Sequence, residues 1–180
     1  MRSIKNFFLE LLLDGDAGFE AYLESLETDP PISCKVLKDG LDVSDRAKSE
    51  DFPHLVIDTI PDKIVRSPAS SPSRGQLRQG GFDVVIAVYR DKTYKSYFET
   101  KEQAEILMEH FAEYLDTKRD TIRAAGYSDL RYRDDDENWG VFLARIGGVD
   151  CVAGRMKFGL EYEWSQGVVM KNKPITLRRS

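Results

Sequence analysis

An acidic run is the first feature of this sequence with residue types suited to chemistry. Residues 132–140 read YRDDDENWG, so Asp134, Asp135 and Asp136 precede Glu137 and then Trp139. Carboxylates hold Mg²⁺ or Ca²⁺ when several oxygens converge on one point. Neighbouring side chains of an extended segment point to opposite faces, so at most Asp134 and Asp136 can share an ion. We therefore predict an acidic turn without a metal site, with Arg131 and Arg133 as nearby countercharges.

Other catalytic patterns are missing from the sequence. No G-x-S-x-G nucleophile motif occurs, and the two histidines have no catalytic signature around them. The paired glycines at 80–81 and 147–148 lack the spacing of phosphate-binding loops. Cys34 and Cys151 are far apart and fit buried or free thiols, and His110 fits a partly exposed helix surface. We expect no cofactor.

Length and composition favour one soluble domain. The chain has 180 residues, a net charge of −5, and 41% hydrophobic and 32% charged residues. No apolar stretch approaches the roughly 18 residues of a membrane span. Lys5 and Glu10 interrupt the N-terminal apolar run, so we predict no signal peptide. The expected organisation is a domain over 1–164 and a basic extension over 165–180.

Two helical regions follow from apolar periodicity. Ser3 is a candidate cap for a helix, or a kinked pair of helices, over 4–26, which the prolines at 30–31 end. A capping box at Thr100 and Gln103 begins the second helix, which runs to about 124–127.

Four segments have the character of strands. They are 51–61, 81–91, 138–146 and 155–164, and the second is apolar on both faces and therefore central. A hairpin loop over 147–154 joins the last two. The order of elements predicts an α+β domain with a four-stranded, mainly antiparallel sheet, helices packed on one face, and a long flexible loop between the first two strands.

Two basic segments stand out in an acidic chain. The Ser- and Pro-rich stretch 65–81 contains Arg66, Arg74 and Arg78 and no acid, which fits a partner-binding loop or a plain flexible insertion. Residues 165–180 carry four basic residues and no acid. They are either a frayed terminus or an arm that a neighbouring subunit orders.

In its order of elements the chain resembles the tail terminator proteins of long-tailed bacteriophages, the lambda-type minor tail protein family. Four segments carry the resemblance, and together they span roughly 50–164 with the N-terminal helix. They are DFPHLVIDTIP, GFDVVIAVYRD, GYSDLRYRDDDENWG and RMKFGLEYEW. The chain departs from the family in a longer region before the first strand, a longer Ser/Pro/Arg loop, the GGVDCVAG insertion and the basic extension.

The resemblance implies a structural protein of the virion without enzymatic activity. Such a protein forms a ring, expected to be a hexamer, that caps the head-proximal end of the tail tube, stops tube polymerisation and meets the head-completion or connector protein. It would work in the neck of the virion after assembly in the host cytoplasm. The segments 66–81 and 147–154 would contact these partners. The residues expected to contact a partner or a neighbouring subunit are Arg66, Arg74, Arg78, Asp134, Asp135, Asp136 and Trp139. Glu161 and Glu163 would face a channel through which DNA passes without specific binding, because an acidic lumen leaves phosphates unneutralised.

Three other functions stay open at this stage. A head–tail connector or tail completion protein is a close neighbour of the terminator. A small α+β protein-binding module would dock a soluble partner through the basic loop. A metal-dependent enzyme would use the aspartate run.

Overall fold

A computed structural model describes residues 3–38, 52–66, 76–90, 96–133 and 140–164. One six-stranded sheet forms the centre of the molecule, in the order β1-β2-β3-β6-β4, and β5 also pairs with β6. All pairs are antiparallel except β1 with β2. The strands are β1 Lys35–Leu37, β2 His54–Arg66, β3 Gln76–Tyr89, β4 Tyr127–Arg133, β5 Gly140–Ile146 and β6 Val149–Trp164.

The predicted four-stranded sheet is therefore wrong, although the broader α+β class fits. The prediction missed β1, which has three residues, and β4, whose sequence YSDLRYR is too polar to give a strand signal. Both strands exist because a long neighbour supplies the pairing. β1 adds in parallel to the first residues of β2, and β4 pairs with the second half of β6.

The predicted long loop over 65–81 is also largely wrong. β2 continues to Arg66 and β3 begins at Gln76, so that only 67–75 lies outside the described residues. β3 pairs with β6 over its whole length, from Gln76 opposite Trp164 to Tyr89 opposite Cys151. This continuous ladder holds the polar, glycine-containing start of β3 in the sheet.

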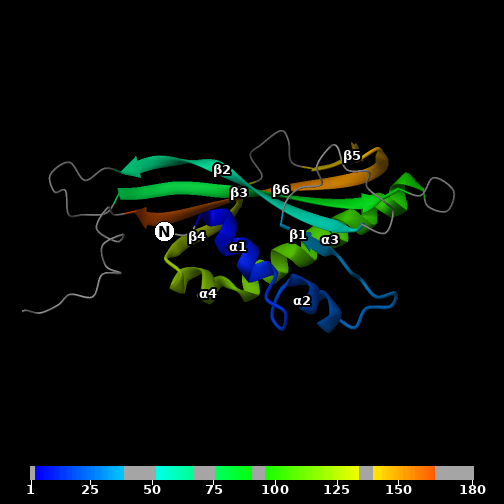
Figure 1. The fold of residues 1–180 in the computed structure, drawn as a ribbon, viewed down its shortest axis with the longest axis horizontal. Coiled ribbons are helices and arrows are strands. Elements are labelled where there is room, and N and C mark those ends of the chain that lie inside the picture. Colours follow the sequence, from blue (N-terminus) through cyan, green and yellow to red (C-terminus); the bar gives the residue numbers. More distant parts are fainter. Residues whose placement is uncertain (1–2, 39–51, 67–75, 91–95, 134–139, 165–180) are drawn as a thin grey trace, which may run out of the picture.

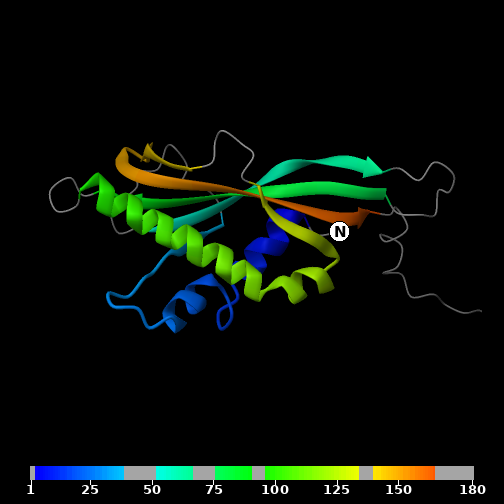
Figure 2. The same cartoon turned by 180° about the vertical axis from the view of Figure 1, so that it is seen from behind.

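Four helices cover one face of the sheet (Figure 1 and Figure 2). They are α1 Ile4–Leu12, α2 Phe19–Ser25, α3 Tyr97–Thr117 and α4 Arg119–Ala124. Ser3 caps α1 as predicted, by accepting the Asn6 N–H at 3.2 Å. The predicted box at Thr100 is wrong, because Ser96 and Glu99 form the capping box of α3.

The core lies between this helical layer and the covered face of β2, β3 and β6. Phe82 of β3 is fully buried, with its ring centroid 5.2 Å from Phe158 and 4.1 Å from Phe8. Met108 of α3 packs against Gly154 of β6, where a Cβ atom would overlap its thioether. The missing side chain thus lets α3 approach the sheet closely.

Tyr114 connects α3 to the N-terminal helices. Its side chain is fully buried, and its hydroxyl donates to the Leu11 carbonyl at 2.7 Å and lies 3.2 Å from the Ala17 carbonyl. Because the last carbonyls of a helix have no partner within the helix, this hydroxyl satisfies one of those at the end of α1.

Candidate interaction surfaces

The acidic run lies outside the described residues, but its two ends are placed. Asp134, Asp135, Asp136 and Trp139 belong to 134–139. β4 ends with Arg133 opposite Lys157, and β5 begins with Gly140 opposite Arg155. The strands before and after the acidic run therefore pair with the same edge of β6, and their ends are opposite positions of β6 that are two residues apart. Among the described residues no group of three or more His, Cys, Asp or Glu side chains could hold a metal ion.

The three candidate arginines are not brought together in one described loop. Arg66 is the last residue of β2, opposite Leu77, and its side chain lies outside the described part of the structure, as does the whole of Arg74. Arg78 is a half-buried residue of β3, opposite Tyr162. Strand pairing has thus placed two of these arginines in the sheet.

The predicted hairpin loop 147–154 is wrong as well. β6 begins at Val149, so Gly147 and Gly148 alone connect it to β5. Their φ angles are 56° and 85°. Two consecutive residues with positive φ are the signature of a type I′ turn, which matches the twist of a two-residue hairpin.

The face of the sheet opposite the described helices is mixed in charge. Alternation along β6 places Arg155, Lys157 and Glu161 on this face, while Met156, Phe158, Leu160 and Tyr162 are buried on the other. This confirms the predicted alternation of the last strand. Arg155 forms an ion pair with Asp83 of β3.

The predicted channel residues lie near the end of this strand. Glu161 is half-buried, and the Ser128 hydroxyl donates to its carbonyl at 3.3 Å. Glu163 is placed only by its backbone, opposite Leu77. Glu161 therefore shares its face with two basic residues of β6.

Three exposed apolar side chains that the sequence prediction missed lie on or near β5. Phe142 is 43% exposed and Leu143 is 57% exposed, although both are in a strand. The start of α3 lies at the same end of the molecule as β5 (Figure 2), and Phe98, in the first turn of this helix, is 77% exposed. We call Phe98, Phe142 and Leu143 the β5 patch. Its sequence signal is the unbroken apolar run VFL, which is neither alternating nor polar on one side.

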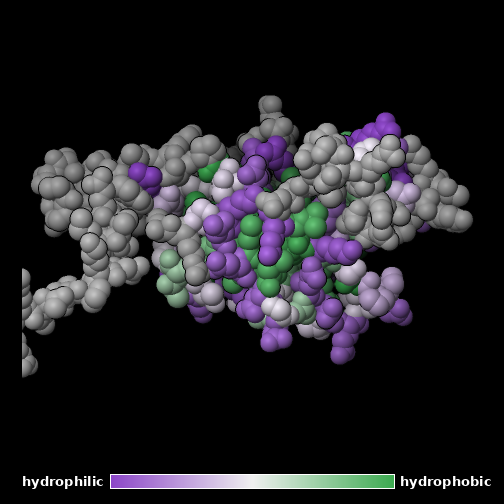
Figure 3. Space-filling view, in the orientation of Figure 1, coloured by the Kyte–Doolittle hydropathy of each residue, from purple (hydrophilic) through white to green (hydrophobic). Residues whose placement is uncertain are grey.

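A second apolar area lies beside α1, on the side toward β1. Figure 3 shows it in green near the centre of that view, framed by hydrophilic side chains. An open cleft of about 660 Å³ at α1 is lined by Lys5, Asn6, Leu9, Glu10, Leu13 and Lys38. Nothing in the described residues indicates an occupant.

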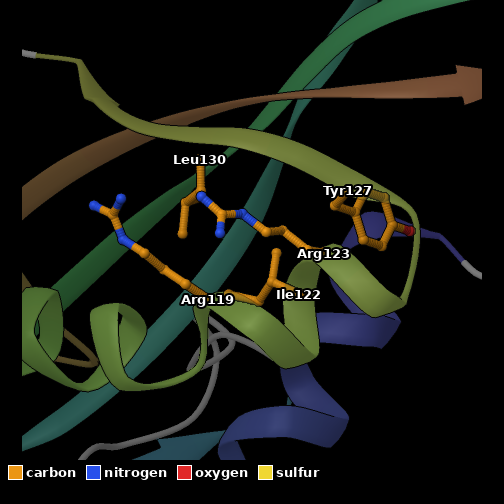
Figure 4. Close-up of a pocket in the computed structure, with 5 residues that line it drawn as sticks. All are labelled: Arg119, Ile122, Arg123, Tyr127 and Leu130. Carbon is orange, nitrogen blue, oxygen red and sulfur yellow. The ribbon is translucent and has the colours of Figure 1, made fainter.

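A smaller pocket, about 70 Å³, lies between α4 and β4 (Figure 4). Arg119 and Arg123 line it together with Ile122, Tyr127 and Leu130. The Arg119 Nε lies 2.8 Å from an Asp116 carboxylate oxygen, and the Arg123 Nη1 lies 3.7 Å from Asp120. Each guanidinium therefore already has an acidic neighbour, so the pair is a poor site for a further anion.

The two thiols have no reactive environment. Cys34 and Cys151 are free and buried, as predicted. Burial raises the pKa of the Cys151 thiol to about 11, and burial also raises the pKa of Cys34. A nucleophilic cysteine needs a lowered pKa and access to solvent, and these two have neither.

His110 belongs to a surface network on α3, which confirms its predicted place on a helix surface. Its Nδ1 lies 3.0 Å from Glu113 Oε2, and the Tyr22 hydroxyl donates to the same oxygen at 3.2 Å. These hydrogen bonds, that of His110 first, lower the pKa of the Glu113 carboxyl. The network joins α2 to α3 at the surface, and its geometry suits a structural role.

No protein-family model matches the chain, and no curated protein sequence matches it. Within the described ranges, none of the helices is both long and apolar enough to cross a membrane.

Proposed function

We propose that this chain is a structural subunit of a bacteriophage neck. In this role a ring of copies, expected to be six, caps the head-proximal end of the tail tube, ends tube polymerisation and meets the head-completion or connector protein. DNA would pass through the ring without specific binding, and Glu161 and Glu163 would face the channel. The subunit has no enzymatic role in this proposal.

The main structural support for this proposal is that the two outer edges of the sheet are made of different residues. One edge is formed by β1 and the rest of β2, and it contains Pro61 and shifts of register. The other is formed by β4 and β5 and includes the apolar Phe142 and Leu143. A closed ring repeats one contact between two different patches, so unlike edges suit it.

The elongated sheet gives further support. β2, β3 and β6 contain 13, 14 and 16 residues, well above the usual strand length of about five or six. Their ends project past the helices at one end of the molecule, and the β5 patch lies at the other (Figure 1). A subunit of this shape can meet one neighbour at each end.

The first experiment is size-exclusion chromatography with light scattering, with and without purified tail tubes. We expect a ring of about six subunits, formed alone or on the tubes. A persistent monomer that does not bind tubes would refute the terminator function and favour a protein-binding module.

A second experiment tests the role of the acidic run. Replacing Asp134, Asp135 and Asp136 by asparagine should weaken assembly while circular dichroism shows a folded monomer. The matched control removes three exposed acids elsewhere in the chain, with Asp16→Asn, Glu24→Gln and Glu27→Gln, and so gives the same change in net charge. Equal loss of assembly in the control would mean that net charge, and not the acidic run, matters. An unfolded triple-asparagine variant would show that the run is needed for folding.

A further inference from the structure

The outer edge of β5 is the least protected strand edge in the described structure. β5 pairs with β6 through an uninterrupted register from Gly140 to Ile146, and no other described strand pairs with it. Natural proteins protect free edges with prolines, bulges and charges. β2 has Pro61 and register shifts, and β4 has a register shift and Arg131, but β5 contains only one charged residue, Arg145.

The exposed apolar side chains of β5 lie on both faces of the sheet. Phe142 is opposite Ala153 on the face without described helices, and Leu143 is opposite Val152 on the helix-covered face. A strand that paired with the outer edge of β5 would therefore shield one apolar side chain on each face. Main-chain hydrogen bonds and alternate side-chain contacts are how an extended segment adds to a sheet edge.

The C-terminal extension has the composition of such a segment. It begins SQGVVMKNKP, and Val168, Val169 and Met170 form an apolar run that places side chains on both faces of an extended chain. Pro174 lacks an N–H and would end the pairing.

Charge also favours binding of the C-terminal extension near β5. The extension contains Lys171, Lys173, Arg178 and Arg179 and no acid. α3, which contacts β5, carries the exposed acids Glu102, Glu105 and Glu109, spaced by three or four residues and therefore on one side of the helix. Glu113 and Asp116 continue this row toward the other end of the helix, where His110 and Arg119 already lie beside them.

Distance excludes pairing of the extension with β5 of its own chain. Leu143 is opposite Val152, which precedes Trp164 by twelve positions on β6, or about 40 Å at about 3.3 Å per residue. Val168 to Met170 follow Trp164 by four to six residues and reach at most roughly 20 Å. A second copy placed end to end with the first brings the two segments together.

We propose that the extension 165–180 of one subunit binds the outer edge of β5 in the next subunit, where its residues before Pro174 add as a strand. This inference rests on the proposed ring and names its subunit contact. The contact is heterologous, because the donor segment and the acceptor edge are different surfaces. Repeated around a ring, it joins every subunit to the next.

The test is disulfide trapping between two full-length variants. One carries Leu143→Cys and the other Val169→Cys, and they are mixed under mild oxidation in the presence of purified tail tubes. The matched control replaces Leu143→Cys by Leu13→Cys, another exposed leucine, on α1. We expect the Leu143→Cys mixture to form the cross-link about 100-fold faster than the control, because thiols held in one complex meet at an effective concentration of about millimolar. Equal rates in the two mixtures would overturn the inference.

Failure of this contact can be distinguished from failure of the ring. We expect Leu143→Glu and Val169→Glu each to reduce the ring to smaller species in light scattering, with native circular dichroism. If the ring persists in both variants and the cross-link does not form, the strand contact is wrong and the ring stands. If the unmodified protein forms no ring with or without tubes, the proposed function fails. The cross-linking result then decides alone whether the extension binds β5.

Discussion

Replacing Tyr114 by phenylalanine removes a single buried hydroxyl from the junction of three helices. The hydroxyl donates to the carbonyl of Leu11 at 2.7 Å, and the Leu11 carbonyl belongs to the last turn of α1. The ring stays in place against Phe19 and Tyr22, so packing changes little. Loss of the donor leaves a part-buried carbonyl without this bond, which costs about 1–3 kcal/mol.

We expect Tyr114→Phe to lower the free energy of unfolding by about 1.5 kcal/mol. At about 2–4 °C per kcal/mol for a chain of this size, Tm should fall by roughly 3–6 °C. Urea unfolding followed by circular dichroism measures the loss, and an unchanged m-value shows that the midpoint shift reports stability. Tyr22→Phe is the matched control, because its hydroxyl bonds the exposed Glu113, and it should change stability by less than about 0.5 kcal/mol.

The pH dependence gives an independent check of the same contact. Burial raises the pKa of Tyr114 above its usual value of 10.0. Its contribution is therefore fully present below pH 10 and is lost as pH rises further, because the unfolded chain releases the proton first. The difference in stability between wild type and Tyr114→Phe should narrow above pH 10. If Tyr114→Phe left the free energy of unfolding unchanged, or lowered it only as much as Tyr22→Phe does, this account of the helix junction would be refuted.

Two further predictions concern the packing of the core. Gly154→Ala should destabilise by about 1–3 kcal/mol, because the new methyl group overlaps the thioether of Met108. In a urea double-mutant cycle with Met108→Ala the two losses should sum to more than the loss of the double variant, whereas strict additivity would contradict the close contact. Cys34 and Cys151 should resist Ellman's reagent in native protein and react rapidly in urea, since both are buried and the pKa of Cys151 is raised to about 11. Fast labelling without denaturant would show that one of them is accessible.

The sequence predicted elements best where one face of an element is buried. The apolar stripe of α3 and the alternation of β6 both depend on contact with one core, so the period of the side chains reveals them. Ser3 was found as a helix cap because capping is a local interaction between a side chain and a nearby N–H.

Elements that depend on pairing with a distant strand were missed. The start of β3 reads QLRQGG and has no strand signal of its own, but it is held by the end of β6 through Gln76 opposite Trp164. Pro61 has no N–H, but β2 can continue through it because not every N–H on the outer edge of this strand is needed for pairing. A shift of register accommodates the proline. Trp164 follows Gln76 by 88 positions, so a local pattern around the start of β3 does not contain its partner.

The same contrast between local patterns and strand pairing explains the outcome for the candidate sites. Arg66 and Arg78 were assigned to a loop because local composition is rich in serine and proline. Strand pairing places both in the sheet, with Arg66 opposite Leu77 of the same hairpin and Arg78 opposite the distant Tyr162. The β5 patch was missed for the opposite reason. Apolar residues in a strand predict burial, and only the sheet order shows that β5 lies at an edge.

The size of the β5 patch bears on when a ring would form. Phe98, Phe142 and Leu143 together expose roughly 300 Å² of apolar surface, given the usual areas of such side chains. Burying it contributes about 7 kcal/mol at about 25 cal/mol per Å². Association costs about 4–15 kcal/mol in lost freedom, so one such contact between two free subunits is marginal. In the proposed ring, subunits held on the end of a tail tube meet their neighbours at high effective concentration, and the same contact becomes sufficient. Ring formation should therefore be weak in free solution and strong on tail tubes, which restricts assembly to the place where the ring is needed.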